Sequence, residues 1–325
     1  MPRLRALAPL LVAAALGVAS CGSTHAAAPT STTLAGSVVP PAPSPTTSAA
    51  PGASAGPSVI AAPVLTVATS DGTVGYRSVG SGPPLVMIMG FGGSIDSWQP
   101  SFVDALAARY RVITLDNAGV GLTTALPAPL TMTAMAAQTS AFITALHLGA
   151  PDVLGWSMGG MIAQALAVTH PDQIHKLVLC ATLSGDGKAT LPSAKVIALL
   201  EAPSGSAGLT LLFPSSQVAA EAAFVTGLLS YPHPYAASKA AVATQEAALS
   251  EWSLHPDPVG SRISSIAVPT LVADGTVDPL IPLPNDDHLA ATIPHAQLAV
   301  YPGAAHAFLF QDQTTFLPRL ESFLG

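Results

Sequence analysis

From residue 63 onward, the hydrophobic positions alternate between two spacings. Short apolar runs bounded by Gly, Pro or Asp predict buried strands over residues 85–89, 110–116, 152–156, 176–182, 270–273 and 297–301. Apolar residues three or four apart predict helices over residues 98–109, 131–148, 158–170 and 307–324. A hairpin at Asp71-Gly72, joining residues 66–69 to 74–79, precedes them. Strands that alternate with helices predict an α/β fold with a mostly parallel sheet flanked by helices.

Residues 186 to about 266 break this alternation. They contain Ala- and Leu-rich helical stretches separated by prolines, and no clear strand. An insertion of about 80 residues between two strands is too long for a plain loop. We therefore expect a helical cap, inserted between late strands and lying over one edge of the sheet.

The N-terminus follows a third pattern. Residues 1–20 are typical of a secretory signal, with Arg3 and Arg5 ahead of a short apolar stretch. The stretch ends in Val18-Ala19-Ser20-Cys21, which resembles the lipobox of bacterial lipoproteins. That resemblance implies that Cys21 becomes the lipid-bearing first residue of the mature chain.

The domain organisation follows from these patterns. Residues 21–62 start with the lipidated Cys and continue as an Ala/Ser/Thr/Pro-rich tether, which we expect to be disordered. Residues 63–325 are long enough for one large α/β domain. We expect an exported protein of the cell envelope, anchored by lipid to the outer face of the cytoplasmic membrane, or secreted if Cys21 is not acylated.

Composition narrows the choice of function. Half of the 325 residues are apolar and only 9% are charged, which would permit a membrane protein. However, a spanning helix needs about 20 consecutive apolar residues, and the longest candidate, residues 6–19, is too short. The net charge of −7 makes nucleic-acid binding unlikely to be the function. With Cys21 acylated, Cys180 has no partner for a disulfide and is expected to be a small buried residue.

A candidate nucleophile lies where a predicted strand meets a predicted helix. Gly155-Trp156-Ser157-Met158-Gly159 matches G-x-S-x-G, in which the serine stands on a strained turn and the glycines allow close packing. Gly52-Ala53-Ser54-Ala55-Gly56 also matches, but it lies in the tether without a strand before it. We therefore predict Ser157 as the nucleophile.

An activated serine needs a base, and the base needs a carboxylate that orients it. Asp278 and His306 each follow a late predicted strand, and we predict them as acid and base. Asp274, Asp286 and Asp287 are alternative carboxylates near the same strand. The first of these is better explained by an Asp-Gly turn.

The sequence contains no complete cofactor-binding motif. The nine histidines show no metal-ligand spacing beside an acidic residue, and no phosphate-binding glycine motif is complete. We therefore expect neither a metal nor another cofactor.

These motifs resemble the α/β-hydrolase fold superfamily over nearly all of residues 63–325. Gly-Trp-Ser-Met-Gly-Gly is similar to the nucleophile turn of capped serine hydrolases related to cofactor-free haloperoxidases and carboxylesterases. The resemblance implies an oxyanion hole made by the backbone N–H groups of Phe91 and Met158. Two positions depart from the family pattern: Met89 stands where His is frequent, and Asn117-Ala118 replaces a polar-Arg pair.

The expected function is therefore a serine hydrolase that cleaves carboxylic esters of small or lipid-like apolar acyl groups through an acyl-enzyme. Cleavage of amide, thioester or carbon–carbon bonds by the same fold is the first alternative. A surface lipoprotein that binds ligands without turnover is the second. The partners expected are a small-molecule or lipid-derived ester and the membrane, and the sequence leaves the oligomeric state open.

Overall fold

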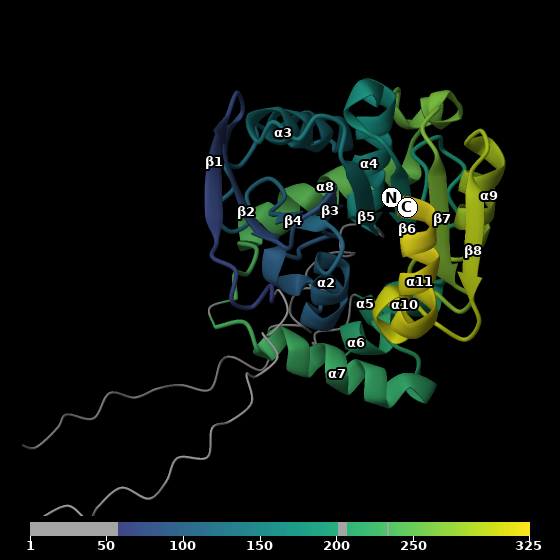
Figure 1. The fold of residues 1–325 in the computed structure, drawn as a ribbon. Helices are drawn as coiled ribbons and strands as arrows, with labels where there is room; N and C mark the ends of the chain where they lie inside the picture. Colours follow the sequence, from purple (N-terminus) through teal and green to yellow (C-terminus); the bar gives the residue numbers. More distant parts are fainter. Residues whose placement is uncertain (1–57, 201–206, 233) are drawn as a thin grey trace, which may run out of the picture.

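A mixed sheet forms the centre of the protein. The computed structural model describes residues 58–200, 207–232 and 234–325, and the predicted signal, Cys21 and most of the predicted tether lie outside them. The predicted start of the domain at residue 63 is too late, because Val59 is buried in the core and its amide donates a hydrogen bond to Asp104 Oδ1 at 2.6 Å. The strands run in the order β1-β2-β4-β3-β5-β6-β7-β8 (Figure 1). They are β1 (Leu65–Thr69), β2 (Gly72–Val79), β3 (Pro84–Ile88), β4 (Arg111–Leu115), β5 (Asp152–Trp156), β6 (Leu177–Cys180), β7 (Thr270–Gly275) and β8 (Gln297–Tyr301). Only the β1–β2 and β2–β4 pairs are antiparallel, so the predicted mostly parallel sheet is confirmed.

The order of the strands reverses at β3. From β3 the chain crosses to β4 on one side and then returns to β5 on the other. At such a point the loops that follow the two strands separate, leaving a crevice at the carboxyl ends of a parallel sheet. The loop after β3 carries Phe91 and the turn after β5 carries Ser157. The topology therefore places both residues at this crevice.

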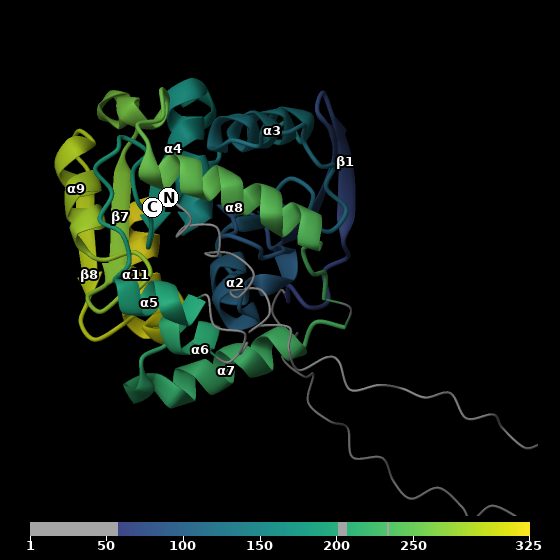
Figure 2. The same cartoon turned by 180° about the vertical axis from the view of Figure 1, so that it is seen from behind.

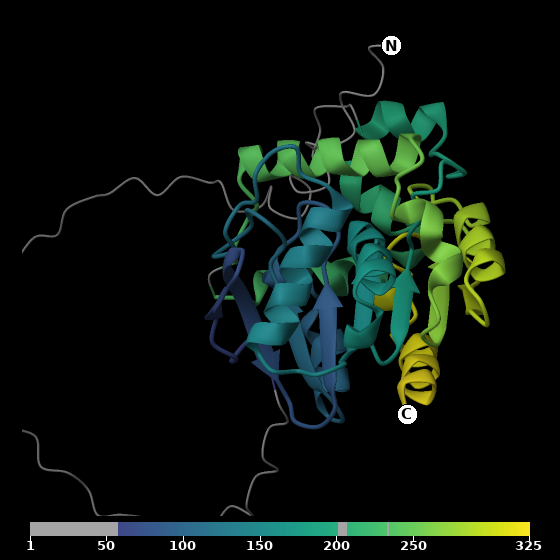
Figure 3. The ribbon, with the colours of Figure 1, turned by 90° about the horizontal axis from the view of Figure 1, so that it is seen from above.

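Helices cover both faces of the sheet. They are α2 (Pro100–Ala107), α3 (Met132–Ala145), α4 (Met158–Thr169), α9 (Pro284–Thr292), α10 (Phe308–Gln311) and α11 (Gln313–Leu324). On one face α3 packs against α4, and on the other α2 packs against α11 (Figure 3). Thr131 caps α3 by accepting a hydrogen bond from the Ala134 amide at 3.0 Å. The prediction of a single helix over residues 307–324 is wrong in one respect, because the chain divides at Asp312 into α10 and α11.

The predicted helical cap is confirmed. Between β6 and β7 the described chain forms α5 (Ala194–Leu200), α6 (Ala207–Leu212), α7 (Val218–Leu229) and α8 (Lys239–Leu254). Helix α8 lies across the end of the sheet toward which the parallel strands point (Figures 2 and 3). The cap therefore lies over the crevice at the strand ends.

Burial follows the predicted pattern of apolar runs. Residues of β5, β6 and β7 are buried throughout, as expected for parallel strands covered on both faces. Cys180, in β6, is buried, as the sequence predicted. Within the described ranges, no helix is both long and apolar enough to cross a membrane.

Candidate active site

Ser157 stands on a strained turn between β5 and α4. Its backbone has φ 57° and ψ −121°, a conformation that a side-chain-bearing residue adopts only when its surroundings enforce it. A Cβ on Gly155 would collide with the carbonyl of Gly159, and a Cβ on Gly159 would collide with the carbonyl of Ile88. Both glycines of the motif are thus needed for this turn to pack against β3.

Asp278 and His306 form a buried hydrogen-bonded pair on the loops after β7 and β8. Asp278 Oδ2 lies 2.6 Å from His306 Nδ1. The other carboxylate oxygen accepts hydrogen bonds from the amides of Leu280 at 2.7 Å and Ile281 at 3.0 Å. Because both oxygens have partners, the carboxylate is fixed, and with it the imidazole. This arrangement leaves Nε2 as the ring nitrogen that can act on another group.

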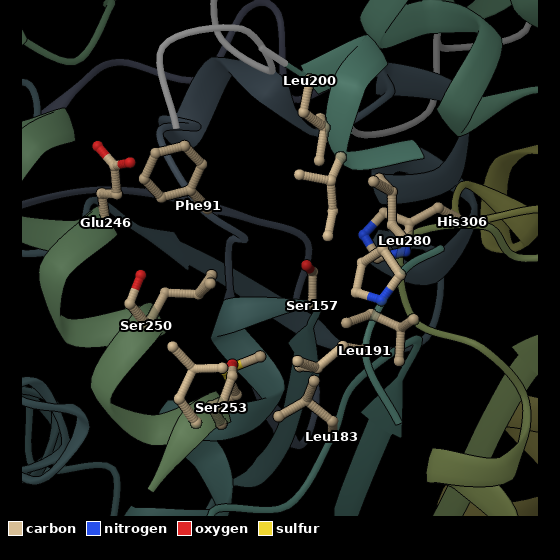
Figure 4. Close-up of a pocket in the computed structure, with 16 residues that line it drawn as sticks. Phe91, Ser157, Leu183, Leu191, Leu200, Glu246, Ser250, Ser253, Leu280 and His306 are labelled. Carbon is tan, nitrogen blue, oxygen red and sulfur yellow. The ribbon is translucent and has the colours of Figure 1, made fainter. Parts of the chain in front are cut away.

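The residue that precedes Ser157 also holds His306. Trp156 Nε1 donates a hydrogen bond to the His306 carbonyl at 3.0 Å, and the two rings lie 5.5 Å apart. Ser157 and His306 both line one pocket, in which Figure 4 shows their side chains next to each other. The structure thus brings the predicted nucleophile, base and acid to one place.

The alternative carboxylates occupy different surroundings. Asp274 and Asp286 are fully buried, whereas Asp287 is exposed. The predicted Asp-Gly turn is wrong, because Asp274 and Gly275 are the last two residues of β7 and pair with Val300 and Tyr301 of β8. Asp274 Oδ1 accepts a hydrogen bond from the Gly275 amide at 2.6 Å. Burial raises the pKa of both buried carboxyls, and the negative charge of nearby Asp278 raises it further. The described chain shows none of these three carboxylates bonded to His306, whose carboxylate partner is Asp278.

The loop after β3 presents backbone donors beside the nucleophile. A Cβ on Gly90 would lie 3.2 Å from Ser157 Cβ, so this loop passes directly over the serine. The Gly93 amide donates to the Gly90 carbonyl at 3.3 Å and closes a tight turn. Among the described residues, the amides of Phe91 and Met158 have no acceptor of their own. Both are therefore available to a negatively charged oxygen at the site.

The pocket that contains Ser157 is predominantly apolar and encloses roughly 800 Å³, its open mouth included. Its apolar lining comes from the loop before α5, from α5, from α8 and from the loop after β7. Residues of these segments that line it include Leu183, Leu191, Ile197, Leu200, Leu249 and Leu280. Glu246, Ser250 and Ser253 add polar groups along one face of α8 (Figure 4).

The sequence did not identify most of this lining. Other large apolar residues of the cap, such as Phe213, Phe224 and Trp252, are buried in the hydrophobic core. Phe224 stacks on Phe310 with ring centroids 5.1 Å apart. Leu229 is exposed. Helical spacing of apolar residues does not indicate which of them enter the core, which stay exposed and which face Ser157.

Comparisons with known proteins agree with this architecture. Residues 83–203 match the family described as alpha/beta hydrolase fold. A protein provisionally named carbamate hydrolase RutD, from Azorhizobium caulinodans, is 29% identical over 272 residues, covering 78% of this chain and 96% of its own. The pimeloyl-[acyl-carrier protein] methyl ester esterase of Aliivibrio salmonicida is 28% identical over 264 residues, covering 77% and 95%.

A solved structure shows the same likeness. The alpha/beta hydrolase fold protein from Chitinophaga pinensis superimposes with a TM-score of 0.71 at 28% sequence identity, covering 82% of this chain and 98% of its own. The strand order, the capped sheet and the matched segment confirm the fold class predicted from the sequence, and the named relatives are hydrolases. This chain therefore has the α/β-hydrolase fold and is a hydrolase.

Proposed function

We propose that this protein is a serine hydrolase that cleaves carboxylic esters, with Ser157 as nucleophile, His306 as base and Asp278 as the orienting acid. The observation that carries the proposal is the buried pair of His306 and Asp278 at 2.6 Å, in the same pocket as Ser157. An isolated glycine-rich turn would not need a fixed imidazole beside it.

In the proposed reaction, Ser157 Oγ attacks the ester carbonyl while His306 Nε2 takes its proton. The amides of Phe91 and Met158 donate hydrogen bonds to the oxyanion that forms. The protonated imidazole, stabilised by Asp278, then gives the proton to the leaving alcohol. Water attacks the acyl-enzyme with His306 again as base, which releases the carboxylic acid and the free serine.

The pocket supports an uncharged, apolar acyl or alcohol group as substrate. Leucine and isoleucine dominate its lining, and no Lys or Arg from the described part of the chain takes part. Glu246 adds a carboxylate, which opposes entry of an anion. The esterase name of the Aliivibrio relative is consistent with ester cleavage.

Labelling with a fluorophosphonate tests the assignment of the nucleophile. We expect the wild type to be labelled and Ser157→Ala to lose both the label and at least about 10³-fold in kcat. Ser250→Ala, which removes another hydroxyl of the same pocket, should keep the label. Equal labelling of wild type and Ser157→Ala would contradict the proposal. A panel of matched esters, amides and thioesters then identifies the bond that is cleaved.

The proposal extends to where the enzyme acts. The run from Arg3 to Cys21 supports export as a lipoprotein, with the segment between Cys21 and the folded domain as a tether from the membrane. Metabolic labelling with a fatty acid should mark the wild type and leave Cys21→Ala unlabelled. An unlabelled wild type recovered from the medium would instead indicate a secreted enzyme.

A further inference from the structure

Helix α8 of the cap contains an unusual buried residue. The side of α8 that faces the protein interior carries Ala241, Gln245, Ala248 and Trp252, four buried residues spaced three or four apart. Gln245 is fully buried, and it is the one member of this stripe with an amide side chain. Burying an amide among apolar groups costs free energy unless it is hydrogen-bonded. We therefore expect the Gln245 side chain to have a hydrogen-bond partner.

Gln245 reaches the loop after β3. Its Oε1 accepts a hydrogen bond from the Gly92 amide at 2.9 Å, across 153 residues of sequence. Gly92 is the third residue of the turn that Gly90 and Gly93 close, and its φ is 65°. A positive φ at this position is characteristic of a type II turn, which differs from type I in the orientation of the central peptide. The Gly92 N–H belongs to that central peptide, so Gln245 fixes its orientation.

The same turn determines where the Phe91 amide points. The Gly90 carbonyl is held inside the turn by the Gly93 amide. In a trans peptide the N–H lies opposite the carbonyl, so the Phe91 N–H points away from this bond. Gly90 itself lies against Ser157. Release of the Gly92 amide would free the central peptide of the turn and weaken the hydrogen bond between Gly93 and Gly90, which orients the peptide that carries the Phe91 donor.

We propose that Gln245 is a positioning residue, which holds the oxyanion-binding loop in its active form from the cap. The inference rests on the proposed function. The core holds the other end of this loop, because Asn117 Nδ2 donates to the Met89 carbonyl at 2.8 Å. Two amide side chains, one from the loop after β4 and one from the cap, thus hold the loop at its two ends. The next residues on the same helix, Glu246 and Leu249, line the substrate pocket.

The test replaces Gln245 by residues that cannot accept the hydrogen bond. Gln245→Met keeps the length of the side chain and removes the acceptor, and Gln245→Asn stays polar but is one methylene too short. In both variants we expect kcat for a neutral ester to fall roughly 10- to 100-fold. Loss of a whole oxyanion donor typically costs about 10²- to 10³-fold, and a contact that only positions the donor should cost no more than that. KM should change less than about twofold, because the pocket is intact.

A second readout separates positioning from loss of structure. An alkyl trifluoromethyl ketone adds to an active serine and places an oxyanion in the hole, so its Ki should rise by the factor by which kcat/KM falls. Gln138→Met is the matched control: Gln138 is also buried, but its amide donates to the Thr124 carbonyl at 3.1 Å in a different region. The control should lose stability and keep kcat and Ki.

The outcomes distinguish the two proposals. If Gln245→Met and Gln245→Asn keep the wild-type kcat while Ser157→Ala is inactive, the positioning role is wrong and the proposed function stands. If Gln245→Met does not fold, Gln245→Asn decides, with circular dichroism showing that it is folded. An increase in KM alone would also overturn the inference. If the wild type itself is not labelled by a fluorophosphonate, the proposed function fails first.

Discussion

At the carboxyl edge of the sheet, reactive groups are held by backbone packing that leaves no room for a methyl group, whereas the cap meets that edge mainly through side chains. Gly155 and Gly159 contact backbone carbonyls directly, and Ser157 is fixed between them. The cap contributes apolar packing and a small number of polar contacts to the core, of which Gln245 to Gly92 is one. The backbone packing at the sheet edge tolerates almost no substitution. The side chains of the cap can be replaced more freely, and the substrate preference can change with them.

A buried ion pair of the core provides a second polar contact that holds the cap. Arg77 in β2 contacts Asp96 at 2.9 Å, and both side chains are almost fully buried. Asp96 Oδ2 accepts a hydrogen bond from the Tyr235 amide at 3.2 Å, in the segment that leads into α8. The guanidinium also lies over the Tyr231 ring, 5.6 Å from its centroid. One charged pair of the core thus holds the chain that connects α7 to α8.

This contrast implies a division of tasks. The sheet edge determines which chemistry is possible, because it carries Ser157, Asp278 and His306. The cap determines which molecules reach that chemistry, because α5 and α8 form much of the pocket. Changes in the cap should therefore alter stability and selectivity, and only those that reach the oxyanion loop should alter the rate of the chemical step.

Among substitutions at the contacts that hold the cap, Arg77→Ala should cause the largest loss of unfolding free energy. Removing one partner of a buried ion pair leaves an uncompensated charge, which typically costs about 3–5 kcal/mol. We expect a loss of unfolding free energy of this size in a urea titration, with premature loss of α8. Arg109→Ala is the control, because its pair with Glu321 is largely exposed at 57% and 25% and should contribute under about 1 kcal/mol. Equal losses in the two variants would contradict the role of the buried pair.

A smaller effect, confined to the sheet edge, should depend on pH. Burial raises the pKa of the Asp286 carboxyl, so the folded state holds this proton at pH values where the unfolded chain has lost it. The stabilising contribution is complete below the unfolded pKa of about 3.9 and is lost as pH rises toward the folded pKa. Each pH unit in this window removes up to about 1.4 kcal/mol.

Asp286→Asn should remove this dependence. Relative to the wild type, the variant should be more stable at pH 8, and its advantage should shrink toward pH 4, as measured by thermal unfolding across this range. Asp287→Asn, the exposed neighbour, should follow the wild-type curve. A constant difference between Asp286→Asn and the wild type at all pH values would show that the carboxyl does not titrate between the two states.

The smallest effect should come from the charge in the cap pocket. Glu246→Gln should raise kcat/KM for an ester with a terminal carboxylate by about three- to tenfold, which is about 1 kcal/mol, since the opposing charge is lost. An uncharged ester of equal length should change less than twofold. Glu251→Gln, an exposed carboxylate on the same helix, serves as control and should not discriminate between the two esters. Unchanged selectivity in Glu246→Gln would remove this carboxylate from the determinants of specificity.

Much of the sheet edge was predictable because its signals are local. A short strand that is apolar after Asp152, a G-x-S-x-G turn and an apolar helix follow one another within 18 residues, and the structure has β5 and α4 within one residue of the predicted ends. Asp278 and His306 could be named for a similar reason, since each follows a short strand. The carboxyl ends of parallel strands meet at one edge, so residues placed there come together even when far apart in sequence.

The cap shows where such prediction stops. Its helices are rich in Ala and Leu on several sides, so spacing alone does not indicate which face lines the pocket and which enters the core. Nothing near Gln245 in the sequence distinguishes it from an exposed glutamine, because its partner Gly92 is 153 residues away. Likewise, the two carboxyls of Asp274 and Asp286 could be read as surface groups until the fold buried both.

The sequence by itself thus determined the order of strands and helices, the insertion of a cap and the residues that belong at the strand ends. These properties depend on hydrophobic periodicity and on turns of a few residues, which each segment encodes alone. Only the tertiary structure decided the lining of the pocket, the contact of Gln245 with the oxyanion loop and the burial of charged pairs. Those properties depend on which surfaces of distant segments pack together, and packing is a property of the assembled chain.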